Sequence, residues 1–216
     1  MTHLSTKETK EENTMITLYE FALSGNCHKV RLMLSLLGLD YRSVAINGSE
    51  RQQKSEDFLS MNPFGQVPVL TDGDVIVRDS QAILVYLAKQ YGNEQWLPNE
   101  AAALAEVSAW LSTAANEVAL GPNRLRLHYK FGRSINLEES QQIALNLLDI
   151  LEKRLEQQQW LAEGHMTIAD IAIFPYIALA PEGNIDLLPY PTIIAWINRI
   201  QALPGYVGMI GMWKSN

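Results

Sequence analysis

The stretch that decides the fold is Asn62-Pro63-Phe64-Gly65-Gln66-Val67-Pro68-Val69-Leu70. Pro63 and Gly65 are typical turn residues, and the β-branched and apolar residues after them predict a short buried strand. Pro68 stands where this strand begins, a position at which a proline is tolerated although it has no N–H for the ladder. If the Val67–Pro68 bond is cis, which costs an X–Pro bond only about 0.5–1 kcal/mol, the backbone groups of Val67 turn outward toward a ligand.

The segments on either side predict a small α/β domain. Upstream, residues 16–21 and 41–46 have the composition of strands. Between them an apolar stripe indicates a helix that ends at Gly38: Val30, Met33, Leu34 and Leu37. The polar segment 48–60 predicts a loop with an irregular helix. Downstream we expect a strand at 75–77 and a helix at 80–91, buried through Ile83, Tyr86 and Leu87. The order is β-α-β-α-β-β-α, in which a right-handed crossover makes the first two strands parallel.

The start of the first helix is suited to holding an anion. Free backbone N–H groups and the helix dipole favour negative charge there, and they lower thiol pKa values. Ser24 precedes this helix, and its hydroxyl could donate a hydrogen bond to a thiolate. Asn26 could donate through its amide. Both residue types are also common N-caps, so the residues alone leave the two interpretations open.

Composition narrows the class of protein. The chain has 216 residues, 47% hydrophobic and 19% charged, as in a globular protein with one large or two small cores. The net charge of −7 argues against a nucleic-acid partner. The one cysteine, Cys27, allows no intramolecular disulfide, which suits the cytoplasm. Residues 1–14 predict a solvated tail without the apolar region of a signal peptide, and the longest apolar run, 171–181, is too short to span a membrane.

The second half predicts an all-helical domain. Turn-forming residues mark a linker at 93–99. Helices are expected at 101–120, at 123–129 after an interruption at Gly121-Pro122, at 137–158 and at 192–202. The buried side of the long helix is expected to carry Ile143, Leu147, Ile150, Leu151 and Leu155. Thr167-Ile168-Ala169-Asp170 is a capping box variant before a helix buried at the centre of the domain, so Asp170 is interpreted as a cap.

Two motifs carry a resemblance to a known family. Gln66-Val67-Pro68, followed eleven residues later by Asp79-Ser80, resembles the glutathione site of the cytosolic glutathione transferases. Ser24-Gly25-Asn26-Cys27-His28-Lys29-Val30 resembles the activating loop of their serine-type and bacterial Nu-like members. The Nu-like class has Thr-Pro-Asn-Gly-His-Lys here, so this chain departs by Ser24 for Thr and by Gly25 for Pro. The resemblance implies an α/β thioredoxin-like domain at 15–92 and an all-α domain at 100–216.

The resemblance also implies roles for residues. Ser24 and Asn26 would hold the thiolate of glutathione. The residues that would bind the rest of the tripeptide are Gln53, Lys54, Gln66, Val67, Pro68, Asp79 and Ser80. In this assignment the Val67 backbone pairs with the cysteinyl backbone, Asp79 meets the γ-glutamyl ammonium, and Ser80 meets its carboxylate. Most of the family has Glu where this chain has Asp79, so that contact could be displaced.

A second-substrate pocket is expected between the domains, with one wall lined by Ala22 and Leu23. Candidates for the other wall are Asn116, Glu117, Arg124 and His128. Arg126 is interpreted as part of a solvated helix face, and His28 and Lys29 as surface residues beside the site. Cys27 is expected to be a small buried hydrophobe, and Tyr19 and Trp110 to be structural. The tail 206–216, which carries Met209, Met212 and Trp213, either covers the second substrate or packs on the surface.

These expectations describe a cytoplasmic, homodimeric glutathione transferase that conjugates the thiolate of glutathione to a hydrophobic electrophile. Glutathione would be a cosubstrate, with no tightly bound cofactor or metal, no nucleic acid and no membrane as partner. Two alternatives remain: a glutathione-dependent disulfide-bond oxidoreductase, and a non-catalytic protein-binding module of the same shape.

Overall fold

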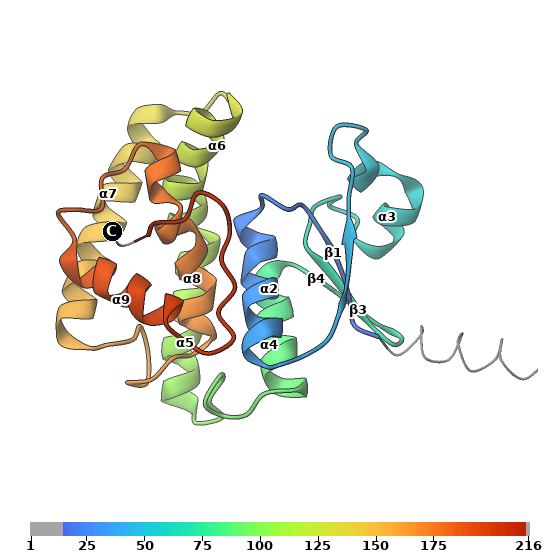
Figure 1. The fold of residues 1–216 in the computed structure, drawn as a ribbon, viewed down its shortest axis with the longest axis horizontal. Helices are drawn as coiled ribbons and strands as arrows, with labels where there is room; N and C mark the ends of the chain where they lie inside the picture. Colours follow the sequence, from blue (N-terminus) through green and yellow to red (C-terminus); the bar gives the residue numbers. More distant parts are fainter. Residues whose placement is uncertain (1–14, 215–216) are drawn as a thin grey trace, which may run out of the picture.

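The computed structural model describes residues 15–214, so the tail expected at 1–14 lies outside the described residues. The N-terminal domain contains a four-stranded sheet in the order β2-β1-β3-β4 (Figure 1). β1 (Thr17–Glu20) is parallel to β2 (Arg42–Ala45) and antiparallel to β3 (Val69–Asp72), and β3 is antiparallel to β4 (Val75–Arg78). The prediction that the first two strands are parallel is therefore confirmed.

Helices of this domain lie on both sides of the sheet. α2 (Gly25–Leu36) and α4 (Ser80–Gln90) lie between the sheet and the helical domain, and the turn η1 (Gln52–Lys54) and α3 (Glu56–Met61) lie beyond the sheet (Figure 1). Because α2 packs against both α4 and, in the helical domain, α8, little of its first half reaches solvent. His28 and Lys29, which were predicted at the surface, are completely buried for this reason.

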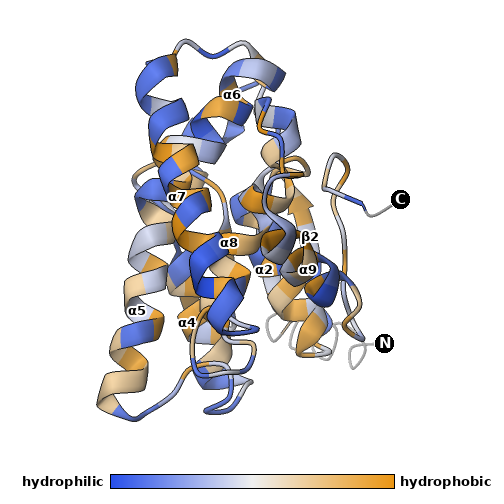
Figure 2. Ribbon diagram, turned by 90° about the vertical axis from the view of Figure 1, so that its left-hand side faces the viewer, coloured by the Kyte–Doolittle hydropathy of each residue, from blue (hydrophilic) through white to orange (hydrophobic). Residues whose placement is uncertain are grey.

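The C-terminal domain is helical. It comprises α5 (Ala101–Ala115), the π-helical turn η2 (Ala119–Asn123), α6 (Arg124–Phe131), α7 (Leu137–Gln157), α8 (Ile168–Ala178), η3 (Ala180–Gly183) and α9 (Pro191–Gln201). Hydrophilic residues run along the outer helices α6 and α7 (Figure 2), whereas every residue of α8 is buried. The thioredoxin-like and helical domains together confirm the predicted fold class.

The capping box at the start of α8 is confirmed. Thr167 Oγ1 accepts a hydrogen bond from the Ala169 N–H, and Asp170 Oδ2 accepts one from the Thr167 N–H. Asp170 Oδ1 accepts two more, from the Leu161 N–H and from Trp196 Nε1. These four interactions join the start of α8 to the preceding loop and to α9.

Two details of the helical domain differ from the prediction. The chain does not break at Gly121-Pro122 but continues through η2 into α6. Gly121 is needed there because a Cβ would lie 2.9 Å from the backbone nitrogen of Ala144 on α7. Ile150 was predicted to be buried and is 57% exposed. The buried face of α7 instead consists of Ser140, Ala144, Leu147, Leu148, Leu151 and Leu155.

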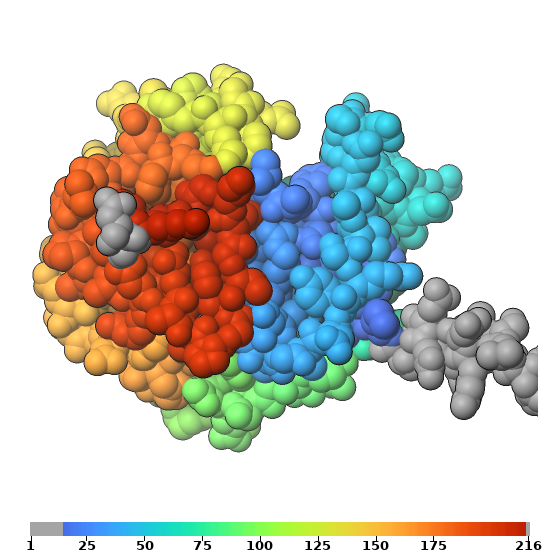
Figure 3. Space-filling view, in the orientation of Figure 1, coloured from blue at the N-terminus to red at the C-terminus, as the bar shows by residue number. Residues whose placement is uncertain are grey.

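The C-terminal segment, residues 203–213, lies along the junction of the two domains (Figure 3). His28 Nε2 is 2.9 Å from the Val207 carbonyl oxygen, and Ser35 Oγ donates to the Gly205 carbonyl at 2.7 Å. The Trp213 N–H donates to the Ala178 carbonyl at 2.7 Å. The segment therefore packs on α2 and on the end of α8. Among the described helices, none is long and apolar enough to cross a membrane.

Candidate functional site

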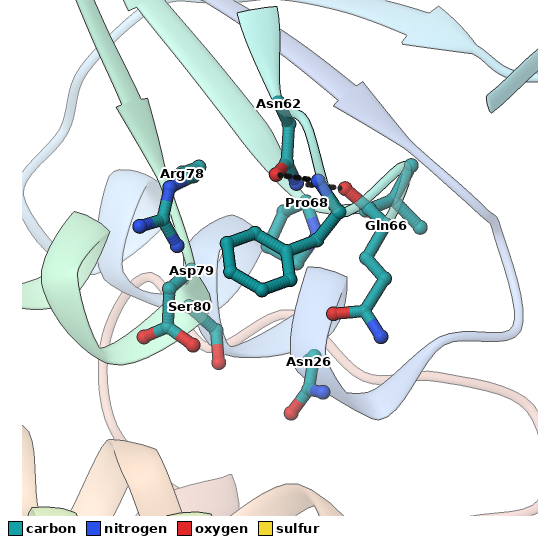
Figure 4. A pocket seen from close by; sticks show the side chains of 9 residues that line it. Asn26, Asn62, Gln66, Pro68, Arg78, Asp79 and Ser80 are labelled. Carbon is teal, nitrogen blue, oxygen red and sulfur yellow. Dashed lines mark hydrogen bonds between the residues drawn. The ribbon is translucent and has the colours of Figure 1, made fainter. Parts of the chain in front are cut away.

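A pocket of about 250 Å³ opens at one end of the sheet. Three segments converge on it: the loop before β3, the junction of β4 with α4, and the start of α2 (Figure 4). Its lining residues are Asn26, Asn62, Phe64, Gln66, Val67, Pro68, Arg78, Asp79 and Ser80. Six of these carry roles implied by the sequence resemblance, and the Val67–Pro68 bond is cis.

Asn62, a residue missed by the sequence reasoning, shapes the loop on one wall of this pocket. Its side chain donates to the Gln66 carbonyl at 2.7 Å and accepts the Phe64 N–H at 3.1 Å (Figure 4). It is only 3% exposed. Gly65 has a φ of +58°, and a Cβ there would lie 2.7 Å from the Gln53 carbonyl oxygen. An Asn-Pro pair followed by a glycine is a turn signal that could have identified this role.

The opposite wall carries the carboxylate of Asp79 and the N-terminus of α4. Asp79 has a φ of +73°, and its Oδ1 caps α4 by accepting the N–H groups of Gln81 and Ala82. No hydrogen bond among residues 15–214 uses Asp79 Oδ2, and Asp79 lines the pocket. Ser80 is 2% exposed, and its hydroxyl donates to Gln81 Oε1. The wall thus offers a carboxylate for an ammonium group and a helix N-terminus for a carboxylate.

Arg78, also missed from the sequence, adds a cation to this wall. Its guanidinium lies 4.7 Å from the centre of the ring of Phe64, which also lines the pocket. Cation–π contacts of this kind contribute roughly 0.5–1 kcal/mol when exposed. The contact between Arg78 and Phe64 therefore joins the end of β4 to the loop before β3.

Asn26, at the start of α2, forms the third wall, and Ser24 just before it is not among the lining residues. Ser24 is the N-cap of α2, and its Oγ accepts the Cys27 N–H at 3.3 Å. This bond uses a lone pair and leaves the hydroxyl proton of Ser24 free to donate to an anion. Asn26 lies two residues further on and lines the pocket. Cys27 is fully buried, and burial raises its pKa to about 11, so it remains a protonated, structural thiol.

The helix α2 also carries a buried lysine. The Lys29 side chain is fully buried, and its Nζ has no hydrogen-bond partner among the described residues. Burial lowers its pKa to about 7, and the charge of Asp79 opposes this effect. Its Nζ lies 5.6 Å from the centre of the Tyr176 ring, on α8. Burial likewise lowers the pKa of His28 to about 4.

Two of the residues predicted to bind glutathione lie outside this pocket's lining. Lys54 Nζ donates to the Phe64 carbonyl at 2.8 Å, so Lys54 supports the loop from its outer side. Gln53 lies beside it, and its Oε1 is buried without a hydrogen-bond partner in the described part of the chain.

A second groove, of about 390 Å³, lies at the domain junction. It is lined by Glu20, Ala22, Leu23, Arg31, Gly208, Met209 and Ile210. Of the predicted second-substrate residues, Ala22 and Leu23 border it. Asn116 donates to the Ser112 carbonyl, Arg124 lies 3.9 Å from Glu139, and His128 Nδ1 lies 2.9 Å from the Arg133 carbonyl oxygen.

Arg126 is the residue of α6 that reaches the N-terminal domain. Its Nη1 donates to the Leu23 carbonyl at 2.9 Å, and its Nε donates to Glu182 Oε2 at 2.7 Å. The prediction that Arg126 belongs to a solvated face is wrong, because its side chain is 3% exposed. Helical periodicity gave no signal for this contact, which joins parts of the chain 103 residues apart.

Comparison with known proteins agrees with this geometry. Residues 18–95 match the family model described as "Glutathione S-transferase, N-terminal domain", and residues 125–204 match "Glutathione S-transferase, C-terminal domain". The chain belongs to the glutathione S-transferase family. The family prediction and the prediction that the chain is an enzyme are therefore confirmed.

Individual relatives of this transferase cover nearly its whole length. The disulfide-bond oxidoreductase YfcG of Escherichia coli (strain K12) is 32% identical, over 88% of this chain and 92% of the relative. A glutathione S-transferase structure from Pseudomonas fluorescens is 33% identical with a TM-score of 0.85, covering 91% of this chain and 99% of that one. A glutathione transferase homologue from Drosophila mojavensis, solved with bound glutathione, is 29% identical with a TM-score of 0.80, covering 88% and 89%.

Proposed function

We propose that this chain is a serine-type, Nu-like glutathione transferase, which binds glutathione in the pocket beside α2 and holds its sulfur as a thiolate. The convergence of the loop before β3, the start of α4 and the start of α2 on one pocket carries this proposal. The Drosophila mojavensis relative with bound glutathione supports the cosubstrate.

The charged groups of glutathione are complementary to those of the pocket. Its γ-glutamyl group carries both an ammonium and a carboxylate. Asp79 Oδ2 meets the ammonium, and Ser80 with the N-terminus of α4 meets the carboxylate. The backbone of Val67 pairs with the cysteinyl backbone, as an added strand would. This binding mode directs the sulfur toward Ser24 and Asn26, while Gln53 and Lys54 support the loop from outside.

The thiolate is stabilised rather than repeatedly protonated. Ser24 donates its hydroxyl proton to the sulfur, while the positive end of the α2 dipole and Asn26 add further stabilisation. Each unit by which the thiol pKa falls corresponds to about 1.4 kcal/mol of preference for the thiolate. The sulfur then attacks an electrophilic carbon, a sulfur–carbon bond forms, and the leaving group departs with its electron pair.

The electrophile binds in the second groove. Ala22, Leu23, Met209 and Ile210 give this groove an apolar lining next to the Ser24 loop. A hydrophobic substrate is therefore expected there. Asn116, Arg124 and His128 make their contacts within the helical domain and are not part of this proposal.

An ultraviolet titration of the glutathione thiolate, with and without the protein, tests the proposal. We expect the thiolate to appear well below the pKa of free glutathione. Binding without a shifted pKa would overturn the activation mechanism and favour the non-catalytic binding module. Turnover of an aryl halide then tests conjugation.

Disulfide reduction is the second candidate, because the 32% identical Escherichia coli relative is named a disulfide-bond oxidoreductase. Turnover of a mixed disulfide, with no measurable conjugation of an aryl halide, would select this alternative. The same bound thiolate serves both reactions, since it attacks either carbon or sulfur.

We also infer that the protein is a cytoplasmic homodimer. Each chain comprises a glutathione-binding domain at 15–92, a linker at 93–99 and a helical domain at 100–216. In the linker, the Trp96 carbonyl accepts the Ile168 N–H at 3.0 Å, which ties it to the start of α8. Light scattering that gave the mass of one 24.3 kDa chain at working concentration would contradict the dimer.

A further inference from the structure

Arg31 connects the two walls of the second groove. It lies on α2, and its side chain is 16% exposed. Its Nη1 donates to the carboxylate of Glu20, at the end of β1. Its Nη2 donates to the Ala22 carbonyl at 3.0 Å and to Met209 Sδ at 3.4 Å. All four residues line the groove, so the guanidinium joins the segment after β1 to the C-terminal segment.

The two hydrogen bonds of Nη2 differ in strength. A backbone carbonyl is a good acceptor, whereas the thioether sulfur of Met209 is a weak one. A ligand oxygen in the place of this sulfur would accept a shorter, charge-assisted hydrogen bond. The methionine side chain has three rotatable bonds and adapts readily to a neighbour, so it can move aside for such a ligand.

The rest of the groove is mainly apolar. Of the seven residues that line it, Arg31 alone has a cationic hydrogen-bond donor on its side chain. Leu23 is 39% exposed and Ile210 is 75% exposed, so both present apolar surface to a ligand. A few polar groups in an apolar site fix the orientation of a ligand and supply its specificity. The groove therefore suits a molecule that combines an apolar body with an acceptor oxygen.

We propose that Arg31 determines the class of electrophile, selecting hydrophobic molecules with a neutral acceptor oxygen, such as a nitro or carbonyl group. This oxygen replaces Met209 Sδ as the acceptor of the Nη2 hydrogen. A carboxylate on the electrophile is disfavoured, because Glu20 already balances the charge of Arg31 and itself lines the groove. This inference rests on the proposed function.

The reaction with such a molecule is the proposed conjugation. With a benzyl chloride, the thiolate sulfur forms a bond to the benzylic carbon, and the carbon–chlorine bond breaks. Chloride leaves with the electron pair, and the thiol proton has already left when the thiolate forms. Arg31 contacts only the acceptor group of the electrophile. It therefore changes which electrophile is preferred and leaves the activation of glutathione unchanged.

4-Nitrobenzyl chloride and benzyl chloride test the inference, because they differ only in the nitro group. The variant combines Arg31→Met with Glu20→Gln, so that no buried charge is left without a partner and the Ser43 hydroxyl keeps an acceptor. We expect kcat/KM for the nitro compound to fall about tenfold and that for benzyl chloride less than twofold. The Kd values of S-(4-nitrobenzyl)glutathione and S-benzylglutathione should change in the same way, and this measurement does not require turnover.

Arg154 provides the matched control. It also joins a carboxylate to a backbone carbonyl, because it donates to Glu106 and, at 3.0 Å, to the Leu161 carbonyl. Both contacts lie outside the groove, so Arg154→Met with Glu106→Gln should keep the wild-type preference for the nitro compounds. An equal loss for both chlorides in the Arg31 variant, or the same change of preference in both variants, overturns the inference.

Arg31→Lys provides a second test if the double variant does not fold. Lysine keeps a positive charge beside Glu20, but it lacks the planar pair of nitrogens that reaches Glu20 and Met209 together. We expect the preference for the nitro compounds to fall about threefold or more. A wild-type preference in this variant contradicts the inference.

Failure of the proposed function gives a different result. A wild-type protein that neither conjugates the two chlorides nor binds the two glutathione conjugates contradicts the proposed function itself. A wild-type protein that conjugates both chlorides, with the same preference in the Arg31 variants, contradicts only the role of Arg31. Tighter binding of S-(4-carboxybenzyl)glutathione than of the nitro conjugate would contradict the selection of a neutral acceptor.

Discussion

Ser24 and Ser55 have the same local role, which makes them a matched pair. Each is an N-cap whose Oγ accepts a backbone N–H at 3.3 Å, from Cys27 and Phe58 respectively. Alanine at either position should cost about 1 kcal/mol of stability. Only Ser24→Ala should also reduce turnover, by roughly 10- to 100-fold, because it loses a hydrogen bond to a charged sulfur. Equal kinetic effects of the two substitutions would show that Ser24 is only a cap.

Lys29 gives a prediction about pH. Its folded pKa of about 7 is below the ordinary lysine value of 10.5, so the unfolded chain binds more protons between these values. Stability of the wild type should therefore rise with pH across this window. Lys29→Met removes the cost of a buried charge and should raise the melting temperature, more at pH 6 than at pH 9.5. Calorimetry that gave the same increase at both pH values would contradict this assignment.

The start of α8 depends on one carboxylate. Asp170→Ala would leave three buried donors without an acceptor, from Leu161, Thr167 and Trp196. Each such group costs about 1–3 kcal/mol, so we expect a loss of roughly 3–5 kcal/mol in urea unfolding. Asp170→Asn keeps one acceptor oxygen and should lose less. If the alanine and asparagine variants are equally stable, the hydrogen bonds are not the source of the effect.

The two domains are held together in part by Arg126. Its contacts with Leu23 and Glu182 link α6 and η3 to the loop before Ser24. Arg126→Met breaks a buried ion pair and should lower the free energy of unfolding by about 3 kcal/mol. Arg124→Met is the control on the same helix, since its partner Glu139 is exposed and 3.9 Å away. A loss below about 1 kcal/mol in Arg126→Met would show that Arg126 contributes little to holding the domains together.

The local sequence determined the turns, the strands and the capping box at Thr167. These features depend on residues a few positions apart, so propensity and periodicity are sufficient to predict them. The resemblance also led to the correct family.

Only the tertiary structure decided which polar residues are buried and which segments meet. Lys29, Arg126 and Tyr176 are buried because α2, α6 and α8 pack across the domain junction. Gly25 and Tyr176 are in contact although 151 positions separate them in the chain. The periodicity of apolar residues along one helix indicates one buried face. It does not show whether a helix distant in the sequence covers a second face. For the same physical reason, the sequence alone could not predict that Tyr176 of α8 lies against Gly25 at the start of α2.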